Sequence, residues 1–121
     1  MVDALNVMRS RWPNLREDSF VELTRAWADR EGVRVLIVFD GRAPGDRTGV
    51  WELDERTSVV GTGGSADDWI AHHAERMASE GRRLWLVSSD RGLRARVAPY
   101  VERTIGGGSF AGQLEMLERE H

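Results

Sequence analysis

Three apolar runs in this chain each lead to an aspartate. The runs are residues 1–2 before Asp3, residues 33–39 before Asp40, and residues 84–87, followed by two serines, before Asp90. Parallel strands bring their carboxyl ends to one edge of a sheet, and open α/β sheets bind ligands at that edge. The pattern therefore predicts an acidic site at one edge of a parallel sheet.

Helical segments separate these runs. The strand at 33–39 is almost continuously apolar and is expected to be buried on both faces, and Gly32 and Gly81 are expected to end the helices before 33–39 and 84–88. Strands are predicted at 1–5, 33–39, 84–88 and 101–105, an edge hairpin or one irregular strand at 50–60, a loop at 40–48, and helices at 18–31, 66–80, 91–100 and 109–120. This alternation predicts an α/β fold of three layers with a mostly parallel sheet of about four to five strands.

The size of the chain is typical of one domain. We expect residues 1–121 to form a single unit whose first strand is truncated, because so few residues precede Asp3. No stretch approaches the roughly 20 apolar residues of a membrane span, and the start lacks a signal-peptide pattern. The expected location is cytoplasmic, away from membranes.

The composition favours oxygen ligands for any metal. The chain has no cysteine, which excludes a thiolate site, and its three histidines leave little material for a histidine-rich site. Two carboxylates about 4 Å apart repel by roughly 4 kcal/mol at an effective dielectric near 20, so clustered acids need compensation. A hard cation, Mg²⁺ or Mn²⁺, would provide it.

A further acidic pair opens the helix predicted at 66–80. Asp67 lies in the middle of the apolar stripe of that helix, so it is directed toward the strand ends. Asp68 is rotated by about 100° around the helix axis from Asp67, and it is expected to be solvated or to contact the metal ligands without binding the metal itself. Taken singly, Asp67, Asp68 and Asp90 are equally well explained as helix-start acids, and Asp40 as a turn residue.

All 17 basic residues are arginines. Those near the predicted acidic edge are Arg9, Arg11, Arg42, Arg47, Arg91, Arg94 and Arg96. Guanidinium groups bind phosphates well, so this placement suits an anionic ligand around a negative centre.

Several short motifs together resemble a known family. Asp3-Ala4-Leu5-Asn6-Val7 resembles the D-G-x-N-V signature of the NYN domains, a branch of the PIN-like nucleases, with Ala4 where the family has glycine. The segments 38–41, 66–70 and 88–90 are similar to its later motifs, and the turn at 107–110 is similar to that of the bacterial YacP-like subgroup. The resemblance covers almost the whole chain in the correct order.

The resemblance implies a metal-dependent endoribonuclease. Asp3, Asp67 and Asp90 would hold the metal, Asp40 would support it, and Asn6 would hydrogen-bond a phosphate, a water or a carboxylate. The metal would polarise a phosphate oxygen and activate an attacking water. Apart from the resemblance, Ser88 and Ser89 are expected to orient Asp90 or, as strand-end serines commonly do, to satisfy only the local backbone. RNA is the implied partner, contacted by Arg9, Arg11, Arg42, Arg47, Arg91 and Arg94; a ribosome or other RNA–protein complex and a homodimer stay open.

Other functions fit the sequence less well or compete with this one. Residues 106–111 match a dinucleotide fingerprint, but no acid follows about 20 residues later to bind a ribose. Receiver domains and haloacid-dehalogenase phosphatases use a lysine, which this chain lacks. The serious alternative is a non-enzymatic one, in which the same fold binds RNA or protein and its acids no longer organise a metal.

Overall fold

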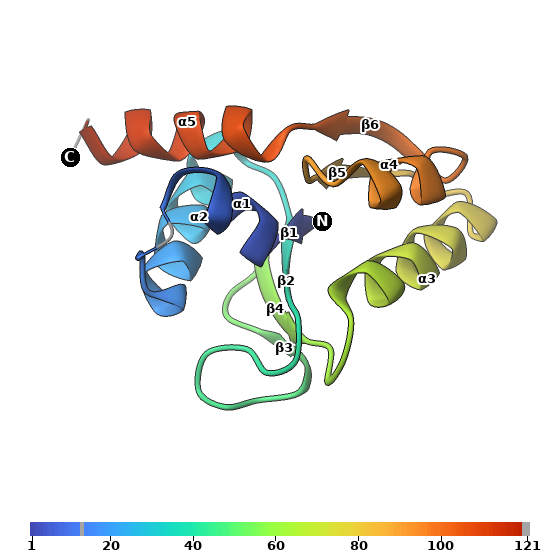
Figure 1. Ribbon diagram of the computed structural model, residues 1–121, viewed down its shortest axis with the longest axis horizontal. Coiled ribbons are helices and arrows are strands. Elements are labelled where there is room, and N and C mark those ends of the chain that lie inside the picture. The colour runs from blue at the N-terminus through green and yellow to red at the C-terminus, as the bar shows by residue number, and fades with distance from the viewer. Residues whose placement is uncertain (13, 120–121) are drawn as a thin grey trace.

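The computed structural model describes residues 1–12 and 14–119, and in this part of the chain one sheet lies between two layers of helices (Figure 1). Helices α1, α2 and α5 lie on one side of the sheet, and α3 and α4 lie on the other. The elements are β1 (Val2–Asp3), α1 (Ala4–Arg11), α2 (Glu17–Glu31), β2 (Val35–Phe39), β3 (Gly49–Glu52), β4 (Thr57–Gly61), α3 (Ala66–Ser79), β5 (Leu84–Val87), α4 (Arg91–Val97), β6 (Val101–Ile105) and α5 (Gly107–Arg119).

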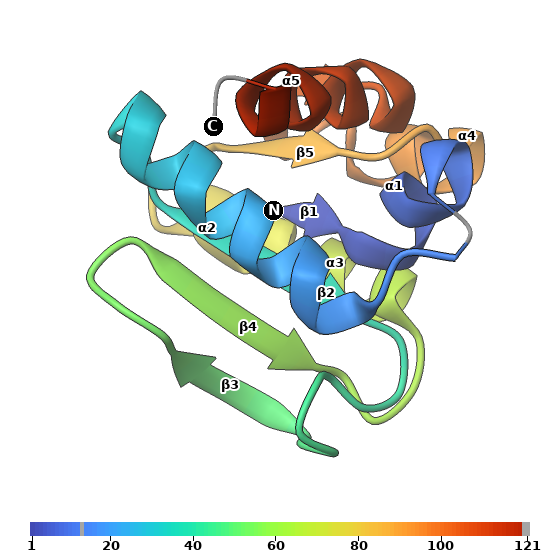
Figure 2. The ribbon, with the colours of Figure 1, turned by 90° about the vertical axis from the view of Figure 1, so that its left-hand side faces the viewer.

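The sheet has the strand order β3-β4-β2-β1-β5-β6. Every pairing is parallel except the one between β3 and β4, which form an antiparallel hairpin at one edge. The parallel strands therefore end on one side, on the right in Figure 2, where α1 and the loop after β2 begin. The predicted three-layer α/β fold is confirmed, and the sheet gains a sixth strand because the 50–60 region forms a hairpin rather than one irregular strand.

Strand β2 shows why the sheet needs helices on both faces. Val35, Ile37 and Phe39 belong to the core cluster shared with α1, α2 and α5. Val38 belongs to the second cluster, shared with α3 and α4. A strand apolar on both faces is stable only when both are covered, so this segment selects a central position in a layered fold.

The helix ends follow local signals. Gly32 adopts the left-handed conformation (φ 68°) and caps α2, because a glycine takes this conformation without steric cost. Ser65 caps α3 by accepting a hydrogen bond from the Asp68 amide at 3.2 Å. Of the described helices, none combines the length and apolar character needed to cross a membrane.

The prediction of a strand over residues 1–5 is wrong beyond Asp3. Helix α1 starts at Ala4, directly after a two-residue strand. Ala4, Val7 and Met8 are its buried residues, and their spacing of three and four is that of a helix face. The methyl group of Ala4 is fully buried in the first core cluster.

Candidate active site

Three of the predicted site residues follow neighbouring strands at the same edge of the sheet. Strand β1 lies between β2 and β5, so Asp3 lies between the strand ends that lead to Asp40 and Asp90. No local sequence pattern requires this order, because strand neighbours are chosen by long-range pairing. We call Asp3, Asp40, Asp67 and Asp90 the acidic edge.

Asp3 is the buried member of the acidic edge. It is 4% exposed, and its Oδ2 accepts a hydrogen bond of 2.9 Å from the hydroxyl of Ser88, which is itself fully buried. The pKa of Asp3 is raised to about 6, first by burial and then by the charges of Asp67, Asp40 and Asp90, against the lowering effect of the Ser88 hydrogen bond. The four carboxylates therefore share one electrostatic environment.

Asp40 and Asp67 are linked through the start of α3. The exposed Asp40 accepts a hydrogen bond from the Ala66 amide at 2.9 Å, which fastens the first turn of α3 to the end of β2. The next residue, Asp67, is half-buried, and burial, followed by the charges of Asp90 and Asp40, raises its pKa. Asp40 thus acts as a positioning residue for α3 and brings Asp67 toward Asp90.

Asp90 begins α4. Its Oδ1 accepts a hydrogen bond from the Leu93 amide at 2.9 Å and so caps the helix. Its own amide donates to the Ser88 hydroxyl oxygen at 3.1 Å. Ser88 therefore joins Asp3 to Asp90. The sequence predicts a contact between Ser88 and Asp90, but not the contact with Asp3 on the neighbouring strand.

A second link runs through Asn6. Its Oδ1 accepts a hydrogen bond from the Ser89 amide at 2.8 Å, and the Ser89 hydroxyl oxygen accepts one from the Gly107 amide at 2.7 Å. A Cβ at Gly107 would lie 3.0 Å from Asn6 Oδ1 and 3.4 Å from the Val7 Cα, so the start of α5 approaches this network closely enough that a side chain there would push its neighbours aside. Asn6 and Ser89 thus tie α1, the end of β5 and α5 together.

Asp68 borders the acidic edge, and its charge adds to the raised pKa of Asp67. It is exposed and forms an ion pair with Arg96 at 2.6 Å, which lowers its pKa. The guanidinium of Arg96 also lowers the pKa of Asp67 to a lesser degree than burial raises it. The charge of Arg96 therefore acts on Asp67 of the acidic edge, although the ion pair of Arg96 is with Asp68.

The arginines predicted to contact RNA fall into two groups. Arg11 pairs with Glu115 at 2.6 Å, Arg42 pairs with Asp46 at 3.2 Å, and Arg47 lies over the Trp51 ring at 5.2 Å. Arg9, Arg91 and Arg94 are exposed and have no ion pair within residues 1–12 and 14–119. The second group is available to an anionic ligand without breaking an internal contact.

The donor chemistry of the acidic edge suits a hard cation, but its side chains are not gathered around one point. Among the described residues, no three acidic or histidine side chains are arranged to hold a metal ion. One oxygen each of Asp3, Asp40 and Asp90 is engaged by a hydrogen bond within the protein. A metal held by three of these carboxylates would require side-chain rotation.

Comparison with known proteins identifies the fold. The crystal structure of Rae1 (YacP) from Bacillus subtilis is similar over 98% of this chain and 74% of that chain, with a TM-score of 0.67 and 21% sequence identity. The fold is that of Rae1. A tryptophan-to-leucine mutant of the same protein matches over 98% and 76% of the two chains, with a TM-score of 0.70 and 20% identity. No protein-family model and no curated protein sequence matches the chain. The fold relationship expected from the NYN-like motifs is thereby supported.

Proposed function

We propose that this protein is an endoribonuclease that hydrolyses RNA phosphodiester bonds at the acidic edge, with Mg²⁺ or Mn²⁺ as the cofactor. The observation that carries the proposal is the placement of Asp3, Asp40, Asp67 and Asp90 at one edge of the sheet, near enough that the charges of the other three raise the pKa of Asp3. In the described part of the chain, none of the four forms an ion pair with an arginine. Neighbouring carboxylates without a paired cation oppose folding, so their presence at one edge favours a functional role.

The fold adds independent support. Rae1 (YacP) shares this architecture, and the motifs at Asp3, Asp40, Asp67 and Asp90 resemble those of the NYN nucleases. Fold alone does not determine activity, so the proposal rests on the site residues.

The residues around the acidic edge would divide the work of binding and positioning. Ser88 fixes Asp3, and Asp40 fixes the helix start that carries Asp67. The exposed arginines Arg9, Arg91 and Arg94 would attract the phosphates of the RNA toward a centre that otherwise repels them. A bound divalent cation would offset the carboxylate charges and polarise a phosphate oxygen.

A cleavage assay tests the proposal directly. Structured and single-stranded RNAs would be incubated with the purified chain and Mg²⁺ or Mn²⁺, and the products separated by length. We expect Asp67→Asn and Asp90→Asn each to lower the rate at least about 100-fold. Asparagine is a good N-cap, so Asp90→Asn should leave α4 folded while removing the charge. A variant that cuts at the wild-type rate would remove that residue from the site.

A matched control and a binding measurement complete the test. Asp18→Asn removes an exposed carboxylate that pairs with Arg16, and the cleavage rate should not change. The metal should raise the melting temperature of the wild type, and Asp67→Asn should diminish that shift. A folded protein that shows neither cleavage nor a metal-dependent shift would instead be the non-enzymatic binding module.

A further inference from the structure

A hollow of about 550 Å³ lies beside the sheet, and none of the four acidic-edge residues lines it. It is lined by the start of β2 and the residues before it, by β1, β5 and β6, and by side chains of α2 and α5. In Figure 2 both β1 and β5 run from left to right, and their amino ends lie between α2 and α5. The hollow is thus on the face of the sheet covered by α1, α2 and α5.

Two indole rings line this hollow. Trp27 is held by an edge-on contact with Phe110, with ring centroids 4.9 Å apart, and its Nε1 donates to Gln113 at 3.1 Å. Trp85 is 45% exposed, although it lies on a strand between two others. Its register partner on β6, Arg103, places a guanidinium 5.0 Å from the centre of the indole ring. The indole Nε1 donates to Glu102 at 3.4 Å, so the exposed ring has a cation at its face and an acid at its edge.

The charged residues of the hollow are mainly basic. Arg34, Arg83 and Arg103 line it together with a single acid, Glu31, in a chain whose net charge is −3. None of the three guanidinium groups forms an ion pair within the described residues. Arg83 donates to the Pro99 carbonyl at 2.9 Å, which restrains its guanidinium without neutralising it. The hollow is a local positive region on an acidic protein.

We propose that this hollow binds an unpaired nucleotide of single-stranded RNA, with the base stacked on Trp85 or on the Arg103 guanidinium and the flanking phosphates contacted by Arg34 and Arg83. Aromatic rings beside arginines are the combination that binds single-stranded nucleic acid with little sequence preference. The basic side chains of the hollow favour an anionic ligand, and the exposed indole of Trp85 favours a ligand with a flat ring. The choice of RNA as the nucleic acid rests on the proposed function, whereas the hollow itself is separate from the acidic edge.

Binding of a labelled single-stranded RNA, measured by fluorescence anisotropy in EDTA, tests this site without cleavage. Arg103→Ala and Trp85→Leu should each weaken binding by about tenfold, because stacking contributes strongly to each bound base. Arg16→Ala is the matched control, since it removes the same charge from an exposed side chain on α2's amino end and should change the dissociation constant by less than about twofold. Equal losses in all three variants would overturn the proposal.

Two further probes separate stacking from simple charge attraction. An abasic RNA of the same length should bind the wild type several-fold more weakly, and equally tight binding would overturn the role of Trp85. Arg103→Lys keeps the charge and should bind between wild type and Arg103→Ala. If the hollow instead buries a second copy of the chain, sedimentation will show a dimer that Trp85→Leu dissociates while RNA binding stays unchanged, which would also overturn the proposal. Because EDTA excludes metal, a failed cleavage assay and a failed binding assay are distinguishable.

Discussion

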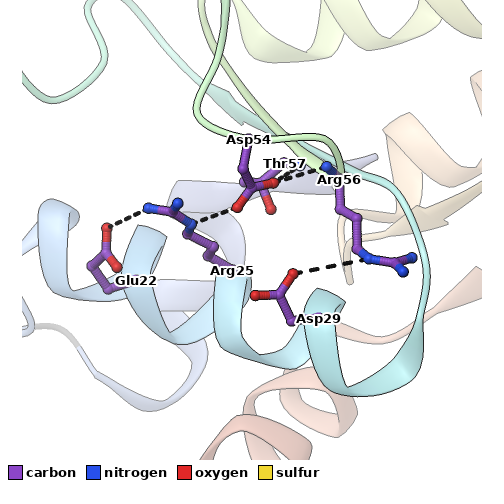
Figure 3. Close-up of polar contacts among 6 residues, drawn as sticks. All are labelled: Glu22, Arg25, Asp29, Asp54, Arg56 and Thr57. Atoms are coloured by element: carbon purple, nitrogen blue, oxygen red, sulfur yellow. Dashed lines mark hydrogen bonds and ion pairs between the residues drawn. The ribbon is translucent and has the colours of Figure 1, made fainter.

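Two regions of this protein shift the pKa of an aspartate in opposite directions. Between α2 and the β3–β4 turn, Asp54 accepts hydrogen bonds from the amides of Arg56 and Thr57, both at 2.8 Å, and from Arg25 Nε at 2.6 Å (Figure 3). These backbone donors, followed by Arg25, lower the pKa of Asp54. At the acidic edge, Asp3 is buried with one hydroxyl donor and three negative neighbours, and its pKa is raised to about 6.

The difference indicates what each carboxylate is for. Asp54 joins a hairpin turn to a helix, and the neighbouring pair of Arg56 and Asp29, at 4.0 Å, bridges the same two elements. The ionised carboxylate of Asp54 is stabilised by donors and a cation within the fold itself. The ionised carboxylate of Asp3 has no such stabilisation, so the acidic edge lowers stability at neutral pH, as groups assembled for ligand binding often do.

The largest predicted effect is a stabilisation by Asp3→Asn. Since the folded-state pKa is about 6 and the ordinary value is 3.8, the native protein retains a proton that the unfolded chain releases. The contribution of Asp3 to the stability of the wild type should therefore fall by about 3 kcal/mol as pH rises from below 4 to above 6, and remain level beyond that. Urea unfolding at several pH values measures this change in stability. Asp3→Asn should remove most of this pH dependence, and an unchanged profile would contradict the raised pKa.

Asp54→Ala, in contrast to Asp3→Asn, should destabilise the protein. Two turn amides and Arg25 lose their acceptor, so we expect the melting temperature to fall by roughly 5 °C. Asp54→Asn should cost less, because the amide oxygen still accepts from both backbone donors. Thermal unfolding monitored by circular dichroism measures both variants. If Asp54→Asn stabilised the protein as Asp3→Asn should, the contrast between the two regions would be lost.

Gly107→Ala tests how closely the scaffold of the acidic edge is packed. The added methyl would crowd Asn6 and Val7, so we expect a loss of about 1–2 kcal/mol in the free energy of unfolding. Gly108→Ala is the control in the same helix, because no atom lies within 4 Å of its added Cβ. It should be neutral or stabilising by up to about 1 kcal/mol. Equal effects in chemical denaturation would show that the contact with Asn6 is unimportant.

Arg96→Ala should have the smallest effect on stability. The ion pair with Asp68 is on the surface, where such pairs contribute little, so the melting temperature should change by no more than about 2 °C. The same variant removes the cation that lowers the pKa of Asp67, and that pKa should rise further. Carboxyl titration by NMR measures this change. An unchanged pKa would show that Arg96 does not act on the acidic edge.

Much of the fold follows from patterns along the chain. The apolar run at β2, the glycine that caps α2 and the apolar stripe of α3 each have a local signature, and β6 has the predicted bounds. Helix α1 was missed because a two-residue strand runs directly into it, so the apolar residues were attributed to one element. Local patterns are weakest where one element ends and the next begins without a loop.

For the candidate site, the sequence alone determined that acids follow strands and open helices, since strand ends and helix starts can be recognised locally. Tertiary structure decided that β1 lies between β2 and β5, that Ser88 reaches Asp3 across 85 positions of the chain, and which arginines are already paired. The reason is physical: the environment of a charge is set by neighbours in space, and strand pairing brings those neighbours from distant parts of the chain.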